Sequence, residues 1–160
     1  MAKIAINISL KSKDKKKQVQ MLLKSRKMYK KHGYYTRKQV PSYKSKTSKH
    51  ILHARKIYGI QNIKPSKELA SKTGCSVAAL KKIVNKGAGA YFSSGSRPNQ
   101  TAQSWGLARL ASSITAGKSA AVDYNILDKG CKHSGKAFKL AQKAKSKYGY
   151  GHSKTKKVIV

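Results

Sequence analysis

The chain has 160 residues, of which 37 are Lys or Arg and 4 are Asp or Glu, so its formal net charge is +33. Self-repulsion of that size argues against a free-standing soluble enzyme and favours a protein held against a polyanion or inside a larger assembly. The basic residues comprise 32 Lys and 5 Arg, and this ratio favours general charge neutralisation over base-specific recognition, because arginine rather than lysine makes planar bidentate contacts.

The charge is unevenly distributed along the chain, and its distribution predicts three parts. Residues 1–64 hold 19 basic and 1 acidic residue, residues 65–131 hold 9 and 3, and residues 132–160 hold 9 and 0. The less charged middle is the part best able to build a core by itself. We therefore predict a mainly α fold with a basic N-terminal arm (1–59), a small helical domain (60–131) and a basic C-terminal helix and tail (132–160).

The N-terminal arm is predicted to contain a short strand followed by helices. Apolar residues alternate with small or polar ones over residues 4–10, which is the period of a strand with one apolar face. Helical spacing then runs from Asp14 to Gly33, and again over residues 51–58 after an extended basic connector. We expect the strand to contact a partner protein through Ile4, Ile6 and Ile8. We expect the run Lys15, Lys16 and Lys17 to contact a polyanion.

Residues 65–87 carry the pattern of two short helices joined by a tight turn. Gly74 permits the turn, and Ser76 is placed to cap the second helix. The pattern is helix-turn-helix-like, and in that arrangement the second helix would direct Lys81 and Lys82 toward phosphate groups. Two short helices that simply form a corner of the core explain the same pattern equally well.

Glycines and a proline predict an ordered loop over residues 87–101, after which Thr101 caps a further helix. Trp105 falls on the apolar side of that helix, and we expect it to be buried and to anchor the loop. Arg97 in the loop and Arg109 on the helix have two candidate roles. They would bond the loop's carbonyl groups, which we favour, or bind phosphate or carboxylate groups of a partner.

A resemblance to a known family rests on the Gly74-Cys75-Ser76 turn, the 91–101 loop with Ser96-Arg97-Pro98, the helix motif Trp105-Gly106-x-Ala108-Arg109, and Thr115-Ala116-Gly117-Lys118. With these motifs, residues 64–131 resemble an uncharacterised domain of large double-stranded DNA viruses of algae and protists, with a more distant version in large phages. Ala116 stands where relatives often carry a second glycine, and the turn remains feasible. The resemblance implies a viral protein packaged in the virion and supplies no enzymatic activity.

The C-terminal part is predicted to hold a basic amphipathic helix and an apolar end. Apolar residues recur at helical spacing from Ala137 to Tyr148, with lysines on the other sides. The last residues, Val158, Ile159 and Val160, suit insertion into a neighbour's groove or addition to its sheet edge. Both ends of the chain are therefore expected to contact other capsid proteins.

The sequence predicts no catalytic residue, no cofactor and no metal site. The run Gly117-Lys118-Ser119 resembles the end of a phosphate-binding loop, but Ser112 stands where that loop needs its first glycine. The pairs His50 with His53, and Cys131 with His133, lack the second ligand pair of a zinc site.

The two cysteines are expected to be reduced and buried. No stretch is long enough to span a bilayer, and we find no export signal, so the protein is expected to be made in the host cytoplasm. Cys75 and Cys131 could pair, but cysteines kept in a reducing compartment usually stay as thiols.

Two functions fit these features, and neither takes a small-molecule substrate. We favour a minor capsid protein of a large double-stranded DNA virus, located in the virion, whose small domain and basic arms tether capsid subunits within a large assembly. Nucleic acid or the inner membrane surface are its further candidate partners. The alternative is a virion DNA-binding or DNA-condensing protein that uses the helix-turn-helix-like element and the lysine-rich arms on phosphates.

Overall fold

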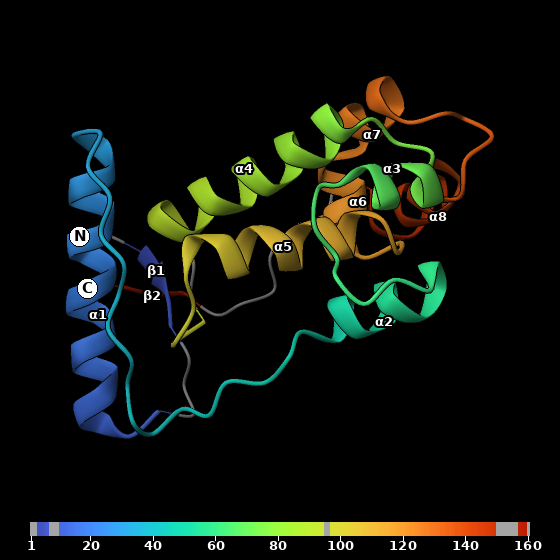
Figure 1. The fold of residues 1–160 in the computed structure, drawn as a ribbon. Helices are drawn as coiled ribbons and strands as arrows, with labels where there is room; N and C mark the ends of the chain where they lie inside the picture. The colour runs from blue at the N-terminus through green and yellow to red at the C-terminus, as the bar shows by residue number, and fades with distance from the viewer. Residues whose placement is uncertain (1–2, 7–9, 95–96, 150–156, 160) are drawn as a thin grey trace. The chain divides into compact units, whose positions relative to one another are not determined.

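A computed structural model shows a mainly helical chain, as the sequence predicts (Figure 1). The structure describes residues 3–6, 10–94, 97–149 and 157–159. The helices within these ranges are α1 (Ser12–Lys30), α2 (Lys49–Tyr58), α3 (Lys67–Thr73), α4 (Val77–Ser94), α5 (Ala102–Ser113), α6 (Lys118–Val122), α7 (Tyr124–Gly130) and α8 (Lys136–Tyr148). Two short strands, β1 (Lys3–Ala5) and β2 (Lys157–Ile159), lie near the ends. Among the described residues, no helix combines the length and the apolar character needed to cross a lipid bilayer.

The chain forms two compact units, and each is assembled from separated segments. The first unit draws on the described residues of 1–46, 88–105 and 154–160, and the second draws on 47–87 and 106–153. This division differs from the predicted arm, domain and tail, because the segment 60–131 contributes to both units. A charge count along the chain can only mark consecutive segments. It cannot show which segments that are distant in the sequence pack together in one core.

The second unit holds the larger apolar core. Its fully buried leucines come from four helices: Leu69 from α3, Leu80 from α4, Leu110 from α5 and Leu127 from α7. Helix α8 adds a stripe of buried side chains, Ala137, Phe138, Ala141 and Ala144, and it packs on α6 and α7. The predicted amphipathic helix over 137–148 is confirmed, but it belongs to this core instead of to an extended basic tail.

Local hydrogen bonds explain where the helices of the second unit begin and end. Ser66 caps α3 by accepting from the Leu69 N–H, and Gly74 ends it in the left-handed conformation with φ 80°. After α5, Ala116 takes the left-handed conformation with φ 62°, while the Gly117 N–H donates to the Ser112 carbonyl. A glycine at residue 116 would adopt this backbone at a lower energy than alanine.

Helix α4 continues through Gly87 and Gly89, where the sequence predicts a loop. The structure explains the difference by close helix packing. A Cβ atom added to Gly87 would lie 2.6 Å from the Cα of Gly106 in α5, and one added to Gly106 would lie 2.5 Å from the carbonyl oxygen of Val84. These two glycines therefore allow the backbones of α4 and α5 to approach closely. In the sequence, a glycine needed for close helix packing looks the same as a glycine needed for a turn.

We expect Gly87→Ala to lower the free energy of unfolding by about 1 to 3 kcal/mol, because the new methyl group must displace the backbone of α5. Gly89→Ala in the same helix is the matched control. Its Cβ would meet the Tyr29 hydroxyl at 3.0 Å, which can move aside, and alanine gains up to about 1 kcal/mol of helix propensity. Urea denaturation measures both variants, and equal stabilities would contradict the close approach of α4 and α5.

The first unit is organised around α1 and the extended segment that follows it. Leu10, Met21 and Val40 form its small apolar cluster. Arg37 is 6% exposed, and it is held by Tyr91 of α4. The Arg37 backbone N–H donates to the Tyr91 hydroxyl at 2.9 Å, Nη1 donates to the Tyr91 carbonyl at 2.9 Å, and the guanidinium lies 3.9 Å from the centre of the ring. Burial lowers the pKa of Arg37 from its ordinary value.

Candidate functional site

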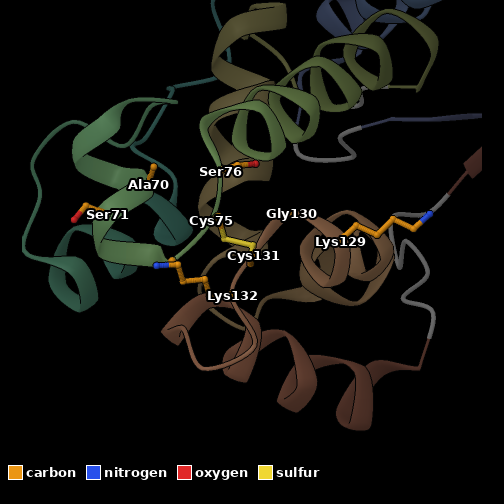
Figure 2. A pocket seen from close by; sticks show the side chains of 9 residues that line it. Ala70, Ser71, Cys75, Ser76, Lys129, Gly130, Cys131 and Lys132 are labelled. Atoms are coloured by element: carbon orange, nitrogen blue, oxygen red, sulfur yellow. A yellow bond between two sulfur atoms is a disulfide. The ribbon is translucent and has the colours of Figure 1, made fainter.

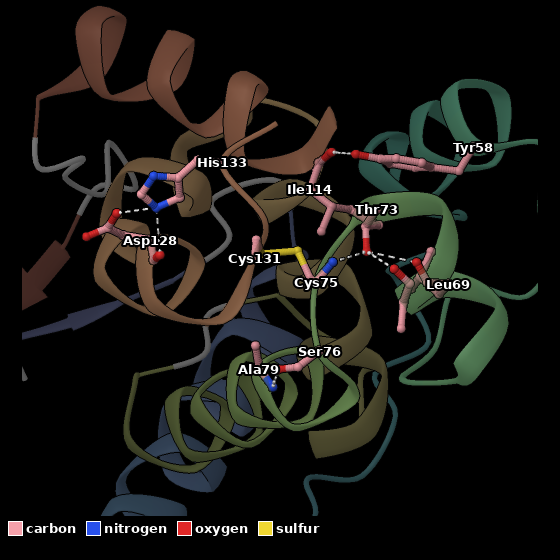
Figure 3. The surroundings of a disulfide bond; sticks show 11 residues. Tyr58, Leu69, Thr73, Cys75, Ser76, Ala79, Ile114, Asp128, Cys131 and His133 are labelled. Carbon is pink, nitrogen blue, oxygen red and sulfur yellow. Dashed lines mark hydrogen bonds and ion pairs between the residues drawn. A yellow bond between two sulfur atoms is a disulfide. The ribbon is translucent and has the colours of Figure 1, made fainter. Parts of the chain in front are cut away.

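A disulfide bond joins Cys75, between α3 and α4, to Cys131, directly after α7 (Figure 3). Both residues are buried, at 4% and 7% exposure, and they form an isolated antiparallel bridge. The expectation that the two cysteines stay reduced is therefore wrong. That expectation used only the compartment, whereas the fold places the two residues, 56 positions apart in the sequence, beside each other.

Backbone hydrogen bonds support the disulfide on both sides. The Ser76 N–H donates to the Gly130 carbonyl, and the Lys132 N–H donates to the Gly74 carbonyl, each at 2.8 Å. A Cβ on Gly130 would collide with the Cβ of Ala79 in the first turn of α4. Glycine at residue 130 therefore lets the end of α7 approach the start of α4.

Side chains next to Cys75 fix the turn between α3 and α4 (Figure 3). The Thr73 hydroxyl donates to the Leu69 carbonyl at 2.8 Å and accepts from the Cys75 N–H at 3.2 Å. The Ser76 hydroxyl accepts from the Ala79 N–H at 3.1 Å, which caps α4 as the sequence predicts. We call residues 74–76 and 130–132, with their disulfide, the cross-linked turn.

Two hollows open beside the cross-linked turn. The first, of about 590 Å³, is shown in Figure 2 and is lined by Ala70, Ser71, Gly74, Cys75, Ser76, Lys129, Gly130, Cys131 and Lys132. The second, of about 340 Å³, is lined by Ser76, Ala78, Ala79, Lys82, Asn125, Ile126, Lys129 and Gly130. The two hollows share Ser76, Lys129 and Gly130, and both bring lysine ammonium groups and serine hydroxyls to one surface.

The lining of the two hollows suits the binding of anions. It contains three exposed lysines, Lys82, Lys129 and Lys132, and no acidic side chain. Asp128 lies close by in the sequence, but its Oδ1 is 2.9 Å from Nε2 of His133, whose ring stacks on Phe138. In the part of the chain that the structure describes, no group of three or more His, Cys, Asp or Glu side chains is placed to hold a metal ion.

A buried carboxylate, Asp123, connects α4 and α5 of the second unit. It is 1% exposed, and Arg109 donates to it through Nε at 2.8 Å and Nη2 at 2.7 Å. The Ser113 hydroxyl donates at 3.1 Å, and Nζ of Lys86 lies 3.1 Å away. Burial alone would raise the pKa of Asp123, but the hydrogen bonds and charges of Arg109 and Lys86 outweigh it and lower that pKa. Arg109 thus binds an internal carboxylate, a role that sequence reasoning missed.

The other residues predicted to contact a polyanion lie on separate elements. Lys15, Lys16 and Lys17 belong to α1 of the first unit, and Lys81 and Lys82 belong to α4 in the second. Arg97 is exposed in the segment before α5. Of this set, Lys82 lies at the hollows.

Asn99 anchors the loop before α5 to the extended segment that follows α1. Trp105 is half-buried on α5, although the sequence predicts a buried anchor. Asn99 takes a left-handed conformation, and its Oδ1 accepts from the Val40 N–H at 2.7 Å. Its Nδ2 donates to the carbonyls of Val40 and Tyr43 at 3.2 and 2.8 Å. Asparagine after a proline is a turn signal that could have indicated this role.

The two strand-like ends pair with each other. Strands β1 and β2 are antiparallel, with Lys3 opposite Ile159, Ile4 opposite Val158 and Ala5 opposite Lys157. Ile6 is buried. The predicted partner-contact residues Ile8 and Val160 lie outside the described residues.

Comparison with known proteins gives a family match over residues 7–130. Searches of curated proteins and of solved structures find no match. A family model described as a family of unknown function (DUF5824) matches residues 7–130. This match includes α1 to α7, so it covers residues 7–59 of the predicted N-terminal arm as well as the predicted helical domain. The chain therefore belongs to the family of unknown function DUF5824.

Proposed function

We propose that this protein is a non-enzymatic component of the particle of a large double-stranded DNA virus, in which its lysines bind the packaged DNA. One observation carries the proposal: three of the four acidic side chains already have partners within the chain. Asp14 accepts from the Ser42 N–H at 2.9 Å, Asp123 binds Arg109, and Asp128 contacts His133. With 32 lysines in the chain, most of the positive charge is left to be balanced by a partner.

The way the lysines are presented favours a polyanion with a regular backbone. Exposed lysines project from folded helices, among them Lys16 and Lys27 of α1, Lys81 and Lys82 of α4, and Lys129 of α7. Basic side chains on helices suit contact with phosphates, which position a protein without reading the base sequence. The viral setting rests on the resemblance of residues 64–131 to the virus domain.

A minor capsid protein that tethers its neighbours is the second candidate. In the described part of the chain, β1 and β2 each pair on one side only, so each leaves an edge to which a strand of another protein could add. We place this candidate second because the two ends that were expected to reach outward pair with each other.

We expect the full chain to bind duplexes of unrelated sequence with the same Kd within about threefold, and with a steep dependence on salt. If six to ten phosphates are contacted, affinity should fall by about 10³ to 10⁵ between 50 and 200 mM salt, because bound counterions are released. Fluorescence anisotropy measures both. A peptide nucleic acid duplex of the same sequence is the control, since it has no phosphates and should not bind.

Two results would count against DNA as the partner. The first is the absence of binding to duplex DNA at 50 mM salt, and the second is equal affinity for the phosphate-free duplex. Either result, together with co-assembly of the chain with capsid proteins, would favour the tether.

A further inference from the structure

We infer that the phosphate backbone of the nucleic acid binds across the two hollows beside the cross-linked turn, where Lys82, Lys129 and Lys132 contact it. This inference rests on the proposed function and assigns a site to it. The contact set draws on α4, α7 and the segment after Cys131, which the disulfide holds together.

The charge of the lining is the first reason to place the site here. Lys132 lines the larger hollow, Lys82 lines the smaller one, and Lys129 lines both. Ser71 and Ser76, which are both exposed, add hydroxyl groups to the same lining. Lysines around a concave surface raise the local potential more than the same lysines on a convex helix face, because the protein walls exclude water.

The rigidity of the cross-linked turn is the second reason. Cys75 and Cys131 are covalently joined, and the backbone N–H of Lys132 itself donates to the Gly74 carbonyl. The Ser76 cap fixes the start of α4, from which Lys82 projects. The backbones that carry the three lysines are therefore fixed relative to one another, so less conformational freedom is lost on binding than at flexible basic segments.

The directions of the side chains indicate the shape of the ligand. Figure 2 shows Lys129 and Lys132 extending to opposite sides of the disulfide. An isolated phosphate ion would need ammonium groups that converge on one point. Groups that diverge across a hollow instead suit a linear polyanion that passes over it and presents successive phosphates.

A pair of matched triple variants tests the site in the full chain. The hollow variant is Lys82→Gln, Lys129→Gln and Lys132→Gln. The control variant is Lys56→Gln, Lys139→Gln and Lys143→Gln, which removes three exposed lysines elsewhere in the second unit. The quantity measured is the slope of log affinity against log salt concentration for a 20-base-pair duplex. The hollow variant should reduce the size of this slope by up to about 2.7, because each phosphate contact contributes about 0.9. The control should change the slope by less than about 1.

The outcomes separate the site from the proposed function. If the two variants lose equal DNA affinity while the wild-type chain binds, the proposed site is wrong. DNA binding would then be a property of the whole surface. Failure of the wild-type chain to bind DNA would overturn both. The site is supported if the hollow variant loses at least tenfold more DNA affinity than the control variant, and circular dichroism shows that both variants are folded.

Acetylation footprinting of the wild-type chain gives a second measurement that needs no variant. With the duplex bound, Lys82, Lys129 and Lys132 should be protected from acetylation at least fivefold more than the control lysines. Uniform protection would overturn the site. Polyglutamate serves as the competing probe: if it protects the same lysines at the same concentration as DNA, the hollows bind an acidic protein surface and the assignment to nucleic acid is wrong.

Discussion

Asp123→Ala is expected to lower the free energy of unfolding by about 3 to 5 kcal/mol, which is the usual effect of removing one partner from a buried ion pair. The substitution leaves the guanidinium of Arg109, whose side chain is 18% exposed, without its carboxylate. It also removes the acceptor of the buried Ser113 hydroxyl. The energetic penalty arises because both groups stay buried while they lose their hydrogen bonds.

Asp128→Ala is the matched control for this experiment. Asp128 also pairs with a basic side chain, His133, but the two side chains are 44% and 64% exposed. An exposed pair contributes about 0 to 1 kcal/mol, so urea denaturation should separate the two variants clearly. Similar losses for both would show that Asp123 does not hold the second unit together.

The same carboxylate sets a pH dependence whose sign follows from its lowered pKa. The stabilisation by ionised Asp123 is fully present above the ordinary carboxyl pKa of 3.8, and it is lost as the pH falls through the lower pKa of the folded state. The stability difference between the wild type and Asp123→Asn should therefore stay constant from pH 7 to about pH 4 and shrink below it. A difference that shrinks already between pH 7 and pH 5 would contradict the lowered pKa.

Loss of the disulfide is the second large effect. The free energy of unfolding of the double variant Cys75→Ala, Cys131→Ala should be lower than that of the wild type by about 4 kcal/mol. The reason is that the disulfide closes a long loop and restricts the unfolded chain. Wild-type protein treated with dithiothreitol should unfold at the same urea concentration as the double variant. An unchanged midpoint after reduction, with alkylation confirming free thiols, would show that the hydrogen bonds of the cross-linked turn suffice without the covalent bond.

The sequence predicts those parts of the fold that local hydrogen bonding decides. Ser76 and Gly74 are recognisable because a cap and a left-handed helix end depend on residues within a few positions. The close packing of Gly87 on Gly106 is not recognisable in the same way, since it depends on a helix that comes later in the chain. The partners of Asp123 are not recognisable for the same reason. The pairing of Cys75 with Cys131 was possible from the sequence, but only the fold shows that the two residues lie beside each other.

The candidate site was predictable only in part. Lys82 was identified because it follows a turn that resembles a DNA-binding element. Lys129 and Lys132 were not, because their sequence neighbourhood resembles every other lysine-containing stretch. What distinguishes them is the concave surface beside them, and that surface exists only once α7 is joined to the α3–α4 turn.

The division of the chain into two interleaved units has a consequence for its synthesis. The first 46 residues complete their unit only with later parts of the chain, among them residues 88–105, which supply Tyr91 for Arg37 and Asn99 for Val40. During translation, the N-terminal segment therefore leaves the ribosome before its partners exist, as an unfolded and strongly basic chain next to ribosomal RNA. Binding of this segment to RNA and folding of the first unit then compete with each other, and folding can win only after the later residues have been synthesised.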